Sequence, residues 1–117
     1  MKDNQIAQKA HAFARRIVKA YQYILNNKKE YNMSNQVVRS GTSVGAMVKE
    51  AEFAQSKADF INKMSIALKE ANETRYWLDL LHYGDYLEDD IYESLDKDIR
   101  EIISILVAIV KSAKENQ

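Results

Sequence analysis

The sequence predicts an all-α fold, an antiparallel up-down-up-down four-helix bundle that forms one domain over residues 1–117. Three observations lead to this fold class. The chain has no proline and three glycines, whereas a β-rich fold needs turn residues about every ten positions. Apolar residues recur three and four positions apart, which is typical of helices with one buried face. The segments between these patterns are short, so neighbouring helices are expected to run antiparallel.

Four apolar stripes place the helices at about residues 4–26, 34–54, 57–83 and 89–114. The first stripe consists of Ile6, Ala10, Phe13, Ile17, Tyr21 and Ile24. The second consists of Val37, Gly41, Val44, Val48 and Ala51, and the third of Phe60, Met64, Ala67, Leu68, Ala71, Leu78 and Leu81. The fourth has nearly heptad spacing, with Ile91, Leu95, Ile99, Ile102, Leu106, Ile109 and Ala113.

The expected helix ends have their own sequence signals. Ser34 and Ser56 are candidate N-caps, because a serine hydroxyl can accept a hydrogen bond from an unpaired backbone N–H. Asp59 follows Ser56 by three residues, as in a capping box. Gly84 is expected to end the third helix in a left-handed conformation.

Gly41 and Gly45 lie four positions apart inside the second expected helix. Glycine costs roughly 1 kcal/mol relative to alanine inside a helix, so this pair indicates close packing against another helix. A phosphate-binding loop is the alternative, but the segment has neither the following Lys-Ser/Thr nor the preceding strand of such a loop.

A structural polar network is expected between the second and third helices, with Arg39, Ser43, Glu70 and Glu73 as its members. The two helices turn around residues 54–56, so Arg39 is level with Glu70 and Glu73. An Arg–carboxylate pair can be partly buried and can fix the register of two helices. The alternative is a catalytic or ligand-binding acid.

No catalytic residue, metal site or cofactor is predicted. A di-metal bundle needs Glu-x-x-His on each of two helices, and the nearest pattern is the single Asp79-Leu-Leu-His82. No motif pairs a nucleophile with a base. The chain is therefore expected not to be an enzyme.

Composition indicates a cytoplasmic protein with no membrane partner. The chain has no cysteine, which suits a reducing compartment and excludes disulfides. No segment approaches the roughly 18 apolar residues that a membrane span needs, and no signal-peptide core is present at the N-terminus.

The net charge is zero, with 17 basic and 17 acidic residues, but the two signs are unevenly distributed. Basic residues gather within residues 1–29 and acidic residues within 83–101. This asymmetry has two explanations, a polyanion-binding face or basic and acidic surfaces that meet each other. The candidate nucleic-acid-binding residues, all on the first helix, are Lys9, Arg15, Arg16 and Lys19; a solvated helix face is the alternative.

The fourth helix has more apolar surface than one stripe requires, and the third has adjacent aromatic residues. Such surfaces are typical of protein interfaces, so we expect a homo-oligomer, with a thicker core as the alternative. The candidate interface residues are Tyr76, Trp77, Ile103, Ile105, Val107 and Val110.

Two stretches resemble a known family. RSGTSVGAMVKEA at 39–51 and SKADFINKMSIALKEANETRYWLDLL at 56–81 resemble the two signatures of the 23S rRNA intervening-sequence proteins. The resemblance implies a four-helix bundle that assembles into a homopentamer and has no catalytic residues. The family is also similar to the accessory variability protein of diversity-generating retroelements, a basic pentamer that binds nucleic acid and a reverse transcriptase.

Two features depart from the family pattern. Met47 stands where the family commonly has Asn, and this chain is neutral whereas the retroelement relative is strongly basic. Two functions therefore stay open. The first is an oligomeric adaptor that contacts RNA, DNA or a nucleic-acid-processing protein through the first helix. The second is a protein–protein scaffold that binds no nucleic acid.

Overall fold

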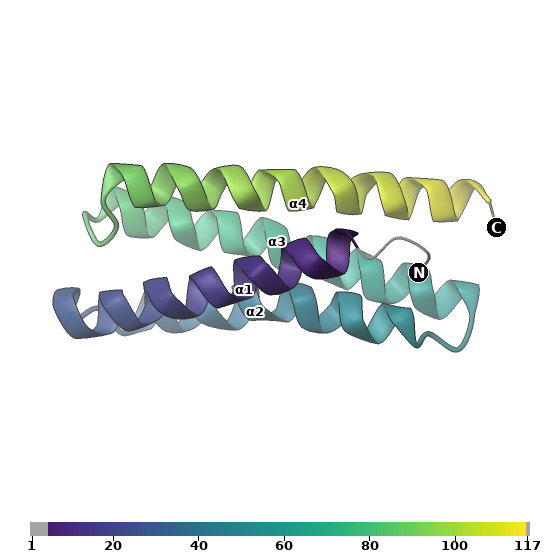
Figure 1. Ribbon diagram of the computed structural model, residues 1–117, viewed down its shortest axis with the longest axis horizontal. Helices are drawn as coiled ribbons and strands as arrows, with labels where there is room; N and C mark the ends of the chain where they lie inside the picture. The colour runs from purple at the N-terminus through teal and green to yellow at the C-terminus, as the bar shows by residue number, and fades with distance from the viewer. Residues whose placement is uncertain (1–4, 117) are drawn as a thin grey trace.

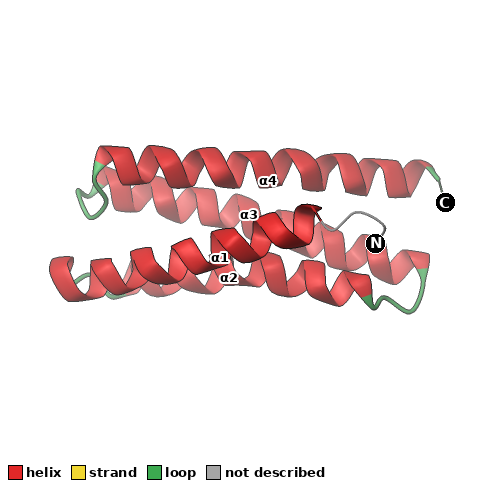
Figure 2. Ribbon diagram, in the orientation of Figure 1, coloured by secondary structure: helices red, strands yellow, loops and turns green. Residues whose placement is uncertain are grey.

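The computed structural model describes residues 5–116 and consists of helices and short connections (Figure 2). Its four α-helices, which lie lengthwise beside one another (Figure 1), are α1 (Gln5–Tyr23), α2 (Asn32–Glu52), α3 (Lys57–Tyr83) and α4 (Asp89–Glu115). A short π-helix, η1 (Ile24–Lys28), extends α1. The described part measures 47 × 20 × 19 Å and contains no strand. The predicted all-α fold with four helices is confirmed.

Contacts between α3 and α4 follow the order of two helices that run in opposite directions. Arg75 Nε donates to Asp96 Oδ1 at 3.1 Å, and His82 Nε2 lies 2.7 Å from Asp89 Oδ1. A residue later in α3 therefore contacts a residue earlier in α4. This order is compatible with an up-down arrangement.

The core follows the apolar stripes, with differences at their edges. Phe13, Ile17 and Leu106 are fully buried, as expected from their periodicity. Tyr21 is only half-buried, and Ala20 is buried instead. The buried residues of all four helices form one cluster. This cluster is the hydrophobic core that the four helices share.

The N-cap prediction is confirmed at Ser56 and wrong at Ser34. Ser56 Oγ accepts a hydrogen bond from Asp59 N at 3.0 Å. Ser34 lies inside α2 and is buried, and its hydroxyl donates to the carbonyl oxygen of Glu30 at 2.7 Å. The Glu30 carboxylate instead accepts from three backbone N–H groups at the start of α2, at 2.8 to 3.0 Å. A carboxylate suits this position because the N-terminal end of a helix is positive.

The prediction that Gly84 is left-handed is also wrong. Gly84 has a φ of −81°, and the left-handed residue is Asp85, with a φ of 66°. The N–H groups of Asp85 and Tyr86 donate to His82 O at 3.1 Å and Leu81 O at 2.9 Å, which is the Schellman pattern of a helix end. A Cβ on Gly84 would lie 2.9 Å from the Tyr86 ring, so Gly84 is required for space.

Gly41 and Gly45 both face α1. A Cβ on Gly41 would lie 3.0 Å from Cγ1 and Cγ2 of Ile17. A Cβ on Gly45 would lie 3.5 Å from the carbonyl oxygen of Ala10 and 3.7 Å from its Cβ. The close approach of α1 to α2 therefore depends on Gly41, whereas Gly45 has room for a methyl group.

The Arg39 side chain reaches from α2 to two acids on α3. Its Nη1 lies 3.4 Å from Glu70 Oε1, and its Nη2 forms an ion pair with Glu73. Ser43 does not join this side-chain network, because its hydroxyl donates to the backbone carbonyl of Arg39 at 2.6 Å. The buried hydroxyls of Ser40 and Thr74 lie beneath the ion pairs, 3.0 Å apart.

Candidate functional site

Three long side chains on α1 reach across to α4. They belong to Lys9, Arg16 and Tyr23, which are seven residues apart and therefore lie on the same side of the helix. Lys9 Nζ donates to Glu101 Oε1 at 2.5 Å, and Arg16 Nη1 donates to Asp98 Oδ2 at 2.5 Å. These contacts join residues 92 and 82 positions apart in the sequence.

Tyr23 forms the third bridge, at the end of α1 that adjoins η1. Its hydroxyl donates to Glu88 Oε2. This hydrogen bond raises the pKa of Tyr23 and lowers the pKa of Glu88. Lys28 Nζ lies 3.9 Å from the same carboxylate oxygen. The turn before α4 is thus attached to the end of α1.

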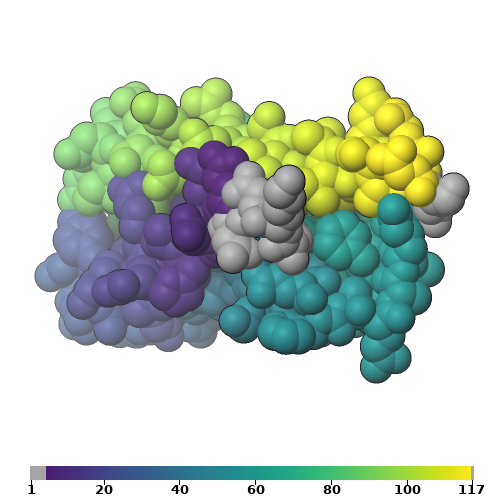
Figure 3. Space-filling view, turned by 45° about the vertical axis from the view of Figure 1, so that its right-hand side comes forward, coloured from purple at the N-terminus to yellow at the C-terminus, as the bar shows by residue number. Residues whose placement is uncertain are grey.

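The bridges support the second explanation of the charge asymmetry, basic and acidic surfaces that meet each other. Basic α1 and acidic α4 meet within one chain, and the space-filling view shows the two segments in contact (Figure 3). Of the four candidate nucleic-acid-binding residues, Lys9 and Arg16 are paired with carboxylates. Arg15 and Lys19 are exposed, and neither forms an ion pair or hydrogen bond with the residues that the structure describes.

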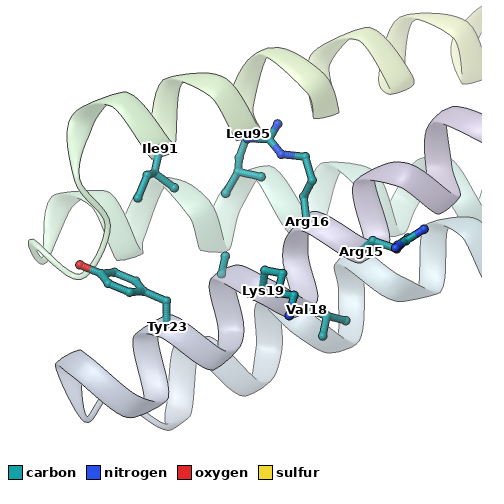
Figure 4. A pocket seen from close by; sticks show the side chains of 8 residues that line it. Arg15, Arg16, Val18, Lys19, Tyr23, Ile91 and Leu95 are labelled. Carbon is teal, nitrogen blue, oxygen red and sulfur yellow. The ribbon is translucent and has the colours of Figure 1, made fainter.

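A groove of about 660 Å³ lies between α1 and the start of α4. Its lining, most of which Figure 4 labels, consists of Arg15, Arg16, Val18, Lys19, Ala20, Tyr23, Ile91 and Leu95. Ile91 and Leu95 lie one turn apart on α4; Ile91 is half-buried and contributes apolar surface, whereas Leu95 is buried and forms the floor. Ala20 faces them from α1 with a side chain too small to fill the space. The groove is therefore apolar inside and has cations on its α1 side.

The position of α1 explains the groove. Gly41 allows α1 to pack closely on α2 through Ile17. On its other side, α1 reaches α4 with long polar side chains such as Arg16, which also donates to Ser94 Oγ at 2.8 Å. The stems of such side chains lie along apolar surface, and the small Ala20 between Arg16 and Tyr23 leaves the space open.

Comparison with protein families matches residues 2–108 to the family described as 23S rRNA-intervening sequence protein. The chain belongs to this family. A crystal structure of a protein with unknown function from the S23 ribosomal protein family, from Bacteroides thetaiotaomicron VPI-5482, is similar to the chain, with 53% sequence identity and a TM-score of 0.89. The match covers 91% of this chain and 98% of that one. Comparison with curated proteins finds no match.

In this 23S rRNA-intervening sequence protein, the candidate interface residues do not form one surface. Val110 is 8% exposed and belongs to the core, so its place in an interface is corrected. Val107 is 47% exposed, and Ile103 lies one turn away on the same side of α4. Ile105 is two positions from both and lines a different groove, near the start of α1.

The two aromatic residues of α3 lie elsewhere. Tyr76 is 58% exposed, and its ring meets that of Trp77 edge-on, with centroids 5.0 Å apart. Trp77 Nε1 donates to Glu73 Oε2 at 3.2 Å. Trp77 therefore extends the Arg39 network, and Tyr76 remains available at the surface.

The surroundings of His82 offer no metal site. His82 lies against Asp89, and its ring stacks on Tyr92 with centroids 4.1 Å apart. Burial raises the pKa of Tyr92, and the nearby Asp96 adds to the shift. Within residues 5–116, no group of three or more His, Cys, Asp or Glu side chains is placed to hold a metal ion. No helix of the described part is long and apolar enough to cross a membrane.

Sequence reasoning missed the groove. The heptad spacing of Lys9, Arg16 and Tyr23 was the available signal, because positions seven apart share a helix face. Ala20 was the second signal, since a small residue between those positions leaves space opposite α4. Neither signal names the partner residues on α4, which are distant in the sequence.

Proposed function

We propose that the chain is a non-enzymatic subunit of a homo-oligomer that serves as a protein–protein scaffold. Each subunit would be an antiparallel up-down-up-down bundle. The observation that carries the proposal is that cations of α1 are neutralised within the chain while large apolar side chains are exposed. Lys9 and Arg16 are paired with carboxylates of α4, whereas large apolar side chains such as Tyr76 and Tyr83 are 58% and 86% exposed.

Electrostatics favour a protein partner over a polyanion. Nucleic-acid binding draws on several cations that release counterions from phosphates. Glu101 and Asp98 lie 2.5 Å from the two cations that they pair with, well within a Debye length of about 8 Å. A phosphate that approached Lys9 or Arg16 would meet nearly neutral pairs.

A nucleic-acid or ribonucleoprotein adaptor is the second candidate, and one observation favours it. Arg15 and Lys19 lie one turn apart on α1, and both are exposed. Two such cations bind phosphate weakly, but several copies in one assembly would bind more tightly through multivalency. The family resemblance supports this candidate through the name of the family alone.

Self-association is proposed to use exposed apolar surface, with Tyr76 and Val107 as the leading residues. The family resemblance supports five subunits. Light scattering after gel filtration should give five times the 13.5 kDa of one chain. Replacement of Tyr76 or Val107 by Glu should reduce this mass, because a charge would then be buried at the interface. A wild-type monomer at micromolar concentration would contradict the oligomer.

Binding measurements separate the two candidate functions. A labelled single-stranded RNA and a duplex DNA are titrated with wild-type protein at about 50 mM salt. The scaffold predicts no salt-dependent binding. The adaptor predicts binding that weakens steeply as salt rises and is lost when Arg15 and Lys19 are both replaced by Glu. That second result would contradict the scaffold.

A further inference from the structure

The groove between α1 and α4 has the length of a short helical contact. Arg16 and Tyr23 bound it along α1, and seven residues of helix span about 10 Å, or two turns. Ile91 and Leu95 face this interval from α4. Ile91 is half-buried and Leu95 is 1% exposed, so an apolar side chain of a partner helix would lie against Ile91 with Leu95 as the floor beneath it.

The two sides of the groove differ in charge. On the α1 side, Arg15 and Lys19 have no ionic partner among the described residues. On the α4 side, Asp98 is paired with Arg16 through a contact of 2.5 Å. Among the residues that line the groove, the charges without an ionic partner are therefore positive and lie on α1, which is complementary to carboxylates along one edge of a partner.

The contents of the groove argue against a nucleic acid as its ligand. Proteins that bind single strands stack the bases on aromatic side chains. Ile91, Leu95 and Ala20 are aliphatic, and Tyr23 is the one aromatic residue of the lining, so the groove offers at most one ring for stacking. Aliphatic surface beside exposed cations suits an amphipathic helix, which lays its apolar face into a groove.

We infer that the groove binds an acidic amphipathic helix of a partner protein. Its apolar residues lie against the half-buried Ile91, above the floor that the buried Leu95 forms, and its carboxylates pair with Arg15 and Lys19. This inference rests on the proposed scaffold function and names the class of its partner.

The test uses a synthetic amphipathic peptide of about four helical turns. Leu occupies its i, i+3, i+4 and i+7 positions, and Glu lines one edge of its apolar face. A matched peptide has Lys in place of Glu. Fluorescence anisotropy of each labelled peptide is measured with the wild-type oligomer at about 0.15 M ionic strength. The Glu peptide should bind, and the Lys peptide should bind at least about tenfold more weakly.

Variants of the protein locate the contact. The double variant Arg15→Glu, Lys19→Glu should weaken binding of the Glu peptide about tenfold or more. Val18→Glu should do the same, because Val18 lines the groove and is 37% exposed. The first control is Phe53→Glu, at a side chain that is 73% exposed and does not line this groove. The second control replaces the exposed Lys111 and Lys114 by Glu. Both controls should leave the affinity unchanged.

Three results would overturn the inference. They are no binding of the Glu peptide, equal binding of the Lys peptide, or equal weakening by the groove and control variants. The scaffold function would survive any of these if the oligomer still bound no RNA or DNA. Displacement of the peptide by RNA at low salt would contradict both, because the groove would then serve a polyanion.

Discussion

Helix α1 contacts α2 and α4 through different kinds of side chain. Toward α2, the helices touch closely at Gly41, and Ile17 is fully buried. Toward α4, Lys9 and Arg16 reach carboxylates with long side chains that are 34% and 40% exposed. One side is closed by apolar contact, and the other is bridged by charge.

The contact of α1 with α2 is therefore expected to contribute more to stability than the contact of α1 with α4. Close apolar packing contributes most of the stability of a bundle, whereas exposed ion pairs contribute little. The open side therefore has room to bind a partner without loss of the fold.

Ile17 and Val18 are neighbours in the sequence, but Ile17 packs against α2 and Val18 lines the groove. Ile17 is 0% exposed and Val18 is 37% exposed. Ile17→Ala should lower the free energy of unfolding by about 2–5 kcal/mol, because it leaves a cavity against α2. Val18→Ala should change it by less than about 0.5 kcal/mol. Urea denaturation measures both values, and equal losses would contradict the distinction.

Gly41 and Gly45 both face α1 from α2 but differ in the space available for a methyl group. Gly41→Ala should destabilise the bundle by about 1–3 kcal/mol, because its methyl group would press on Ile17. Gly45→Ala meets only ordinary contacts with Ala10 at 3.5 Å or more. It should be neutral or stabilise by up to about 1 kcal/mol through helix propensity. Thermal unfolding checks the signs, and a stabilising Gly41→Ala would show that α1 and α2 are not in close contact.

Two arginines allow a comparison of the ion pairs between α2 and α3 with the ion pair between α1 and α4. Arg39 pairs with Glu70 and Glu73, whose side chains are 16% and 30% exposed, whereas Arg16 pairs with Asp98, which is 43% exposed. Arg39→Met should cost about 1 kcal/mol and Arg16→Met a few tenths, because Arg39 joins two carboxylates that are partly shielded from water and Arg16 joins one that is more exposed. A larger loss for Arg16 in denaturant titrations would show that charge holds the open side together.

The smallest effect is a pH dependence at Glu101. The hydrogen bond from Lys9 lowers the pKa of Glu101 from its ordinary value of 4.5. A carboxyl group whose pKa is lowered by folding stabilises the protein above that ordinary value, and the contribution is lost as pH falls through the folded pKa. Lys9→Gln should therefore reduce the loss of stability below pH 4.5. Acid titration of both proteins tests this, and identical profiles would contradict the Lys9–Glu101 contact.

Local signals predicted much of the fold. Apolar periodicity identified four helices, and Ser56 with Asp59 marked the start of α3 because a cap involves residues three apart. Ser34 was misleading because an upstream carboxylate, from Glu30, already accepts the N–H groups at that helix end. Gly84 was misleading because glycine was needed for space beside Tyr86 rather than for a left-handed backbone.

The candidate site was predicted only in part. The basic residues of α1 were identified, but their partners Glu101 and Asp98 lie 92 and 82 residues away. A helical pattern gives the side of α1 on which a residue lies and does not give the neighbour that faces it. Val110 was misassigned for the same reason, since its burial depends on how α4 is rotated in the bundle.

Methyl NMR of the wild-type protein tests whether α1 is closed toward α2 and open to a partner beside α4. The Glu peptide is added to protein labelled at isoleucine, leucine and valine methyl groups. Shifts should be largest at Val18, Ile91 and Leu95 and negligible at Val44 and Val48 in the closed core. Larger shifts at Val44 and Val48, or none at the groove, would contradict the account.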